Sequence, residues 1–168
     1  LRIDLAKPSD DADIRAILQC TPMPGPVEVA YMREPSFSES LHVLGRTNDV
    51  LVTRRDSDDR AIAFGTRSEK DAYVNGHRCA LGYLGNLRIL PEYRSGRVLA
   101  QGYAFLAGRH RQGKALLYLS TIMESNRNAL QLLTSGRSCL PAYHDIGRFC
   151  CMAIGLGQAT SEPPSSIH

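Results

Sequence analysis

The hydrophobic and polar positions follow two different periods at the start of the chain. Residues 2–5 (Arg-Ile-Asp-Leu) alternate, which predicts an edge strand. Residues 9–11 (Ser-Asp-Asp) supply a cap and favourable charge for a helix start. One apolar face of that helix is formed by Ile14, Ile17 and Leu18, and a proline-rich loop ends it. The pattern therefore predicts a strand followed by an amphipathic helix.

A weakly helical stretch over residues 35–47 precedes a region with the pattern of a sheet. Strands are predicted at 50–52, at 61–74 and at 77–90. The Asn75-Gly76 pair between the last two favours a two-residue hairpin turn, because both turn positions need positive φ. The glycines at 82 and 85 indicate a bulge in the returning strand or the close approach of another backbone.

The second half of the chain alternates between helices and strands. The predicted order is a helix over 96–112, a strand over 115–123 buried on both faces, a short helix capped by Ser125 and ended by Gly136, and two short strands, one near Tyr143 and one over 149–154. A meander followed by a strand-helix-strand crossover predicts an α/β or α+β fold. Its sheet is mixed and mostly antiparallel, flanked by helices, and the crossover makes 77–90 and 115–123 parallel.

Length and composition place these elements in one domain. The 168 residues fit a domain over 1–156, with a polar tail or linker at 157–168. A net charge of +3 and the absence of Trp give no support for a nucleic-acid partner, and no apolar run is long enough to span a membrane. Five cysteines without a CxxC pair predict neither a disulfide framework nor a metal site. We therefore expect a cytoplasmic protein.

The segment with the most chemical content is Leu87–Leu99, read Leu-Arg-Ile-Leu-Pro-Glu-Tyr-Arg-Ser-Gly-Arg-Val-Leu. A strand leads into a tight Arg/Gly loop, and the loop opens a helix. Free amide groups and the helix dipole favour an anion at such a helix start, and Arg94 and Arg97 add positive charge. A diphosphate fits this pattern; the alternative is a solvated strand-to-helix turn with exposed arginines.

This segment resembles the acetyl-CoA signature of the GNAT superfamily of N-acetyltransferases, in which an apolar strand precedes Pro-Glu-Tyr-Arg, a Gly-rich loop and a helix. The later stretch from Glu124 to Leu133 resembles the family's Asn-x-x-Ala helix, with Asn126 and Ala129 at the motif positions. The element order over residues 2–155 is also similar. The resemblance implies the GNAT fold with splayed parallel central strands, and transfer of acetyl from acetyl-CoA to an amine of a small molecule or peptide. It is compatible with a homodimer.

The resemblance also implies which residues hold acetyl-CoA. Leu87 and Ile89 offer strand backbone to the pantetheine arm, and Asn126 lies near that arm at the start of its helix. Asn126 has an alternative interpretation as a helix-start residue with a local hydrogen bond. The diphosphate is wrapped, chiefly by backbone amides, by Arg94, Ser95, Gly96, Arg97, Val98 and Leu99.

The sequence departs from the family pattern in the loop and at the usual general acid. The family loop has two small-residue positions that are Arg97 and Leu99 here, which leaves Gly96 as the loop's glycine. A Cβ at both positions narrows the approach of backbone to a phosphate. Leu133 stands where the family often has the Tyr that protonates the leaving thiolate.

Other residues must then do the acid–base work. Glu124, at the end of the predicted buried strand, is the candidate base, and the alternative is a helix-start carboxylate favoured by the dipole. Tyr143 and His144 are candidates for acid or base, and the alternative is a packed Tyr beside an exposed His. Ser120 and Thr121 are interpreted as sheet residues.

Three functional hypotheses remain open. The first is an acyl-CoA-dependent N-acyltransferase that works by direct attack of an amine on the thioester. The second is a non-catalytic GNAT-like module that binds CoA or a partner. The third is a phosphate-binding or nucleotide-binding regulator that uses residues 94–99, although these lack a Walker-type Lys.

Overall fold

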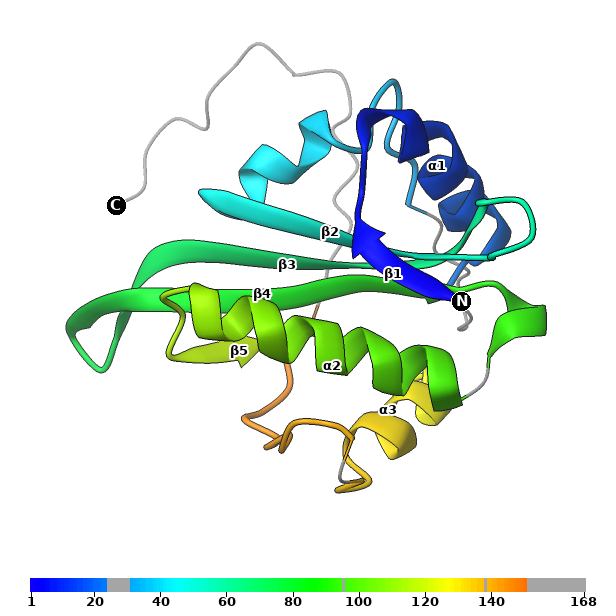
Figure 1. The fold of residues 1–168 in the computed structure, drawn as a ribbon. Coiled ribbons are helices and arrows are strands. Elements are labelled where there is room, and N and C mark those ends of the chain that lie inside the picture. The colour runs from blue at the N-terminus through cyan, green and yellow to red at the C-terminus, as the bar shows by residue number, and fades with distance from the viewer. Residues whose placement is uncertain (24–30, 95, 138, 151–168) are drawn as a thin grey trace, which may run out of the picture.

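A computed structural model describes residues 1–23, 31–94, 96–137 and 139–150. They form one five-stranded sheet in the order β1-β2-β3-β4-β5 (Figure 1). The strands are β1 (Arg2–Leu5), β2 (Thr47–Arg54), β3 (Ala61–Val74), β4 (His77–Ile89) and β5 (Leu117–Leu119). The first four pair antiparallel and β5 pairs parallel with β4, which confirms the predicted mixed, mostly antiparallel sheet.

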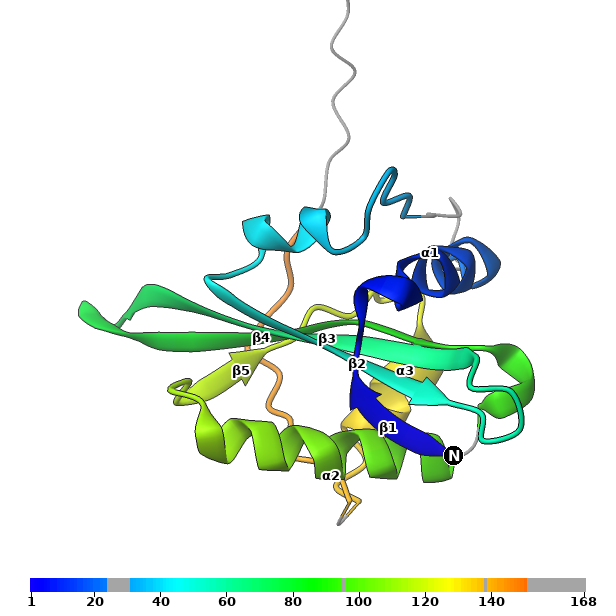
Figure 2. The same ribbon diagram turned by 45° about the horizontal axis from the view of Figure 1, so that its top comes forward.

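Helices cover both faces of this sheet (Figure 2). The α-helices are α1 (Asp11–Cys20), α2 (Gly96–Gln112) and α3 (Arg127–Leu133), and short 3-10 turns lie at Pro8–Asp10, Glu39–Val43 and Pro91–Tyr93. α1 and the turn Glu39–Val43 lie on one face, here called the α1 face, and α2 lies on the opposite α2 face. No helix in the described ranges is long and apolar enough to cross a bilayer.

The α1 face carries the main apolar core. Ile14, Ile17 and Leu18 of α1 are buried there, as the helical period predicts. They pack on Val52 and Phe64 of the sheet, and the Phe64 ring meets the Phe37 ring edge to face, with 5.2 Å between centroids. Burial of these side chains is the dominant stabilising contribution on this face.

The hairpin between β3 and β4 forms at the predicted turn, with φ of +50° at Asn75 and +81° at Gly76. The predicted bulge is also present. Thr66 pairs with Gly85 but Phe64 pairs with Arg88, so β4 has one extra residue there, and Asn86 has φ of +53°. A Cβ at Gly82 or Gly85 would collide with the ring of Tyr118 or Tyr83 respectively. The close approach is thus made by aromatic rings and not by another backbone.

The prediction of the strands after α2 is partly wrong. The strand predicted at 115–123 is reduced to Leu117–Leu119, and it is not buried on both faces, because Leu116 is 75% exposed. β5 is the end strand of the sheet, so it has one paired edge. No strand forms near Tyr143 or elsewhere in 141–150, and residues 151–154 lie outside the described residues, as does the predicted tail.

The two predicted caps are also corrected. Asn126, not Ser125, is the cap of α3, since its side chain accepts a hydrogen bond from the Ala129 N–H. Asp10 precedes α1 without capping it through its side chain. Its carboxylate accepts hydrogen bonds from the Lys7 N–H and from both terminal nitrogens of Arg54, each at 2.6 Å. A buried ion pair has replaced the predicted cap.

Candidate active site

The candidate active site is the place where β4 and β5 part. Their parallel pairing covers Leu81–Leu117, Gly82–Tyr118 and Tyr83–Leu119 and then ends. β4 continues through the bulge to Ile89, while residues 120–123 do not form a strand. Two parallel strands that separate in this way leave backbone groups of each strand without a neighbour, as the predicted splay requires. We call this region the open end.

In the last residues of β4, the N–H and carbonyl groups of every second residue are directed toward the open end. The Leu90 N–H bonds to the Ile62 carbonyl of β3 at 3.0 Å. Because strand groups alternate in direction, Leu87 and Ile89 point away from β3. Their carbonyls meet arginine side chains: Arg88 Nη1 donates to Leu87 O at 3.0 Å, and Arg94 Nε donates to Ile89 O at 3.2 Å. The N–H groups of Leu87 and Ile89 share this direction.

The predicted diphosphate loop lies directly after β4. The 3-10 turn Pro91–Tyr93 connects the strand to α2, whose first amides have no partner within the helix. Arg94 and Arg97 are exposed, whereas Val98 and Leu99 are 3% and 6% exposed. Their side chains therefore belong to the core, and only their amides are available to a ligand. Ser95 lies outside the described residues.

α3 lies near the N-terminal end of α2 in both views (Figures 1 and 2). The Asn126 side chain accepts from the Ala129 N–H at 3.2 Å, which is the local hydrogen bond of the alternative interpretation. Leu133, which replaces the expected Tyr, is 7% exposed. An apolar side chain buried at that position contributes packing and supplies no proton.

The three predicted acid–base candidates do not converge. The Glu124 side chain is 67% exposed and forms an ion pair with Arg148 at 3.3 Å. The Tyr143 hydroxyl forms a hydrogen bond with the Tyr103 hydroxyl of α2 at 2.7 Å, and His144 is exposed. Burial, reinforced by the bond to Tyr143, raises the pKa of Tyr103 well above its usual value. Tyr143 thus lies on the α2 side, bonded to a Tyr of α2.

Sequence reasoning missed a hydroxyl pair at the point where the strands part. Tyr83 is the last β4 residue paired with β5, and its hydroxyl is 2.6 Å from Thr121 Oγ1. The Tyr83 ring lies over Gly85, two residues along on the same face. Its cross-strand partner is Ser68, which places the pair on the α1 face. The available signal was a Tyr two residues before a strand glycine.

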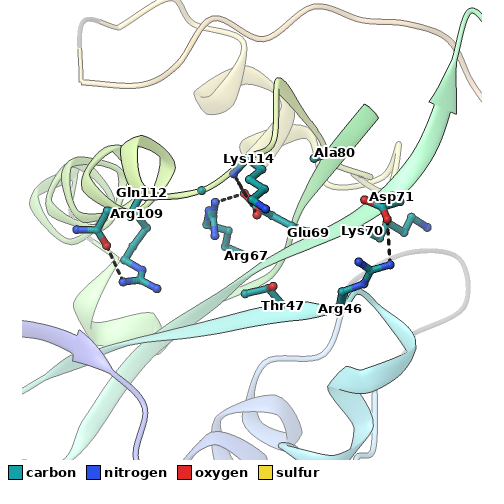
Figure 3. A pocket seen from close by; sticks show the side chains of 11 residues that line it. Arg46, Thr47, Arg67, Glu69, Lys70, Asp71, Ala80, Arg109, Gln112 and Lys114 are labelled. Carbon is teal, nitrogen blue, oxygen red and sulfur yellow. Dashed lines mark hydrogen bonds and ion pairs between the residues drawn. The ribbon is translucent and has the colours of Figure 1, made fainter. Parts of the chain in front are cut away.

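A cavity of about 300 Å³ lies at the opposite end of the β4–β5 pair (Figure 3). Its charged lining is largely paired within the protein. Arg67 bonds Asp49 at 3.0 Å and the Tyr118 hydroxyl at 2.9 Å, and it also bonds Glu69. Arg109 of α2 bonds Asp49 at 2.9 Å. We call these five residues the Arg67 cluster; it joins α2 and β5 to the sheet.

Comparison with known proteins bears on the fold. No family model matches the chain, and neither does any curated protein. Solved structures do match. An aminoglycoside 6'-N-acetyltransferase from Acinetobacter baumannii aligns with a TM-score of 0.64 and 19% identity, over 93% of this chain and 99% of that one.

Two further structures show how far this similarity extends. The glucosamine-6-phosphate N-acetyltransferase from Arabidopsis thaliana aligns with a TM-score of 0.61 and 13% identity, over 90% of this chain and 98% of that one. An aminoglycoside N-acetyltransferase in complex with CoA aligns with a TM-score of 0.64 and 14% identity, over 92% and 99%. The chain therefore has the fold of the GNAT acetyltransferases, as the motif resemblance implies.

Proposed function

We propose that this protein is an N-acetyltransferase that moves an acetyl group from acetyl-CoA to an amine. The observation that carries the proposal is the open end itself: β4 and β5 part after Tyr83–Leu119, and β4 leads directly to the free amides of α2. An extended ligand arm can lie along the parted strand while a phosphate group meets a helix N-terminus. The fold shared with acetyltransferases supports the same function.

The residues at the open end fit acetyl-CoA in their chemistry. The N–H groups of Leu87 and Ile89 are directed to the side where the pantetheine arm would lie. The amides of Gly96, Arg97, Val98 and Leu99 would meet the diphosphate, with Arg94 and Arg97 adding charge. Arg94 would have to keep or exchange its bond to the Ile89 carbonyl when the ligand binds.

The reaction would be a direct attack of a neutral amine on the thioester carbonyl. The attack forms a C–N bond, and the C–S bond breaks as the amine loses a proton and the thiolate gains one. A strand amide can stabilise the negative charge on the carbonyl oxygen. Tyr83, at the vertex of the open end, is our candidate for the proton donor to the thiolate. Glu124 and Tyr143 remain candidates for acid–base work.

Calorimetry with acetyl-CoA followed by a thiol-release assay across amines tests the proposal. We expect binding of acetyl-CoA, and thiol release that depends on both the protein and an amine. No binding at millimolar acetyl-CoA would overturn it. The double variant Leu87→Pro, Ile89→Pro removes both N–H groups directed to the open end, so it should weaken binding. Circular dichroism must show that this variant remains folded.

A non-catalytic CoA-binding module is the second candidate, and two observations favour it. The position of the usual proton donor holds the buried Leu133, and the carbonyls of Leu87 and Ile89 are engaged by Arg88 and Arg94. A protein that binds acetyl-CoA without releasing thiol to any amine of a broad panel would support the module. Turnover of a single amine would exclude it.

A further inference from the structure

The guanidinium of Arg88 lies at the open end without an acidic partner. Arg88 follows the bulge in β4 and pairs with Phe64, so its side chain lies on the α1 face. Its Nε is buried and makes no hydrogen bond within the described residues. Its Nη1 donates to the neutral carbonyl of Leu87 at 3.0 Å. That carbonyl points away from β3, so the charged head lies toward the parted strands.

Arg88 is half-buried, and a charge that is partly removed from water without a counter-ion is costly, so proteins normally pair it. No carboxylate of the described part of the chain is among the charges that act on Arg88. Burial lowers the pKa of the Arg88 guanidinium, and Tyr31 is the described group whose charge opposes that shift. Packing alone does not explain an arginine at this position, because a Met or Leu side chain would fill a similar volume without the cost of removing a charge from water.

Tyr31, the described group whose charge acts on Arg88, is also contacted by a second arginine. The guanidinium of Arg33 lies over the Tyr31 ring, 5.5 Å from its centroid. Tyr83 and Thr121, the hydroxyl pair at the vertex, are on the same α1 face of the sheet. A molecule held by Arg88 therefore lies on the side from which it can reach the vertex. The Arg88 Nε is buried, but the Nη end of the guanidinium is exposed, and its N–H groups can donate to the oxygens of a carboxylate.

We propose that the amine acceptor carries an anionic oxygen group, foremost a carboxylate, and that Arg88 binds this group. The inference rests on the proposed acetyl transfer and assigns its substrate class. The acceptor would place its anionic end on Arg88 and its amine toward the vertex near Tyr83. A ligand anion would supply the counter-ion that the described residues do not.

The first test compares matched amines that differ in one anionic group. γ-Aminobutyrate is compared with its amide, and phosphoethanolamine with ethanolamine, by thiol release from acetyl-CoA. We expect the acidic member of at least one pair to be preferred by about 10- to 100-fold in kcat/KM. Preference for γ-aminobutyrate identifies a carboxylate site, and preference for phosphoethanolamine alone identifies a phosphate site. Equal kcat/KM within both pairs would overturn the proposal.

Variants at two arginines of the same strand sharpen this test. Arg88→Met should bring the ratio of acidic to neutral amine close to one, and Arg88→Lys should retain part of the preference. Arg78→Met is the matched control, because the Arg78 side chain is 66% exposed at the far end of β4, and it should leave the preference unchanged. A preference that survives in Arg88→Met would show that another group binds the anion.

A binding measurement separates this inference from the proposed acetyl transfer. Thermal shift with γ-aminobutyrate and with its amide requires no turnover. Stabilisation by the acid alone, lost in Arg88→Met, supports the anion site even if thiol release fails. No shift with γ-aminobutyrate and none with phosphoethanolamine would overturn it. Glu28 lies outside the described residues and is tested by the double variant Glu28→Gln, Arg88→Met. If its loss of stability differs from the sum of the two single losses, Glu28 is the partner of Arg88, and the proposal is overturned.

Discussion

Arg54, Arg67 and Arg88 all lie on the inner strands of the sheet, but their surroundings differ. The side chains of Arg54 and Arg67 are 4% and 3% exposed, and each binds carboxylates of the protein itself. Arg88 has a buried Nε and no such carboxylate in the described ranges. The first two lie where the sheet is continuous, and Arg88 lies where β4 has left β5.

This difference separates charges that hold the fold together from one that is available to a ligand. Arg67 is satisfied on every side by Asp49, Glu69 and Tyr118, so the Arg67 cluster joins α2 to the sheet without needing another molecule. A satisfied buried network is costly to break, because the partners left behind are also buried. Replacement of the half-buried Arg88 leaves no such partner behind among the described residues. Substitution should therefore affect the two kinds of arginine in opposite ways.

The largest effect is expected for Arg67→Met. The substitution leaves Asp49 with Arg109 alone and removes a buried cation from Glu69, so we expect a loss of about 3–5 kcal/mol in the free energy of unfolding. Urea unfolding measures it. The control is Arg46→Met, whose side chain is 76% exposed and pairs with Asp71; it should cost less than about 1 kcal/mol. Equal losses in the two variants would contradict the comparison.

The second-largest effect is expected on the rate of acetyl transfer at the open end. Tyr83→Phe removes the hydroxyl that bonds Thr121, and if Tyr83 protonates the thiolate, kcat for acetyl transfer should fall about 100-fold. Calorimetric affinity for acetyl-CoA should change little. Tyr73→Phe is the control, since Tyr73 is 77% exposed near the hairpin. An unchanged kcat in Tyr83→Phe would remove Tyr83 from the mechanism and leave Glu124 and Tyr143.

The sequence predicts features that depend on neighbouring residues better than features that depend on contacts between distant segments. The hairpin at Asn75-Gly76 and the amphipathic helix around Ile14 depend on local conformation and periodicity, and both formed as predicted. The strand at 115–123 was predicted from apolar composition alone. Its burial depends on which segments cover β5, and Leu116 is 75% exposed. Composition cannot specify that distant neighbour.

The same limit applies to the candidate site. The loop after β4 is predictable because its residues are contiguous, and the direction of Leu87 and Ile89 follows from strand alternation. Tyr83 and Thr121 are 38 residues apart, and their contact depends on the register of β4 against β5. Arg88 does not stand out in the sequence, because a charge in a strand becomes unusual only when its partners are known.

A smaller effect, which depends on pH, is expected at the other paired arginine. Arg54 foremost holds the pKa of the Asp10 carboxyl below its ordinary value. A depressed pKa in the folded state stabilises the protein above the unfolded pKa of about 4, and that contribution is lost as pH falls through the folded pKa. Asp10→Asn should therefore cost about 2 kcal/mol at pH 7 and progressively less below pH 4. A pH-independent difference in urea unfolding would contradict this.

The smallest effect on stability is expected at Arg88, and it decides the comparison. Arg88→Met replaces a charge that lacks an acidic partner in the described residues by an apolar side chain of similar length. No buried carboxylate of the described chain is left behind, and the cost of burying the guanidinium is removed. The free energy of unfolding should stay within about 0.5 kcal/mol of the wild type or rise. A loss of the size expected for Arg67→Met would mean that Arg88 also serves the fold, and the distinction between structural and ligand-binding arginines would fail.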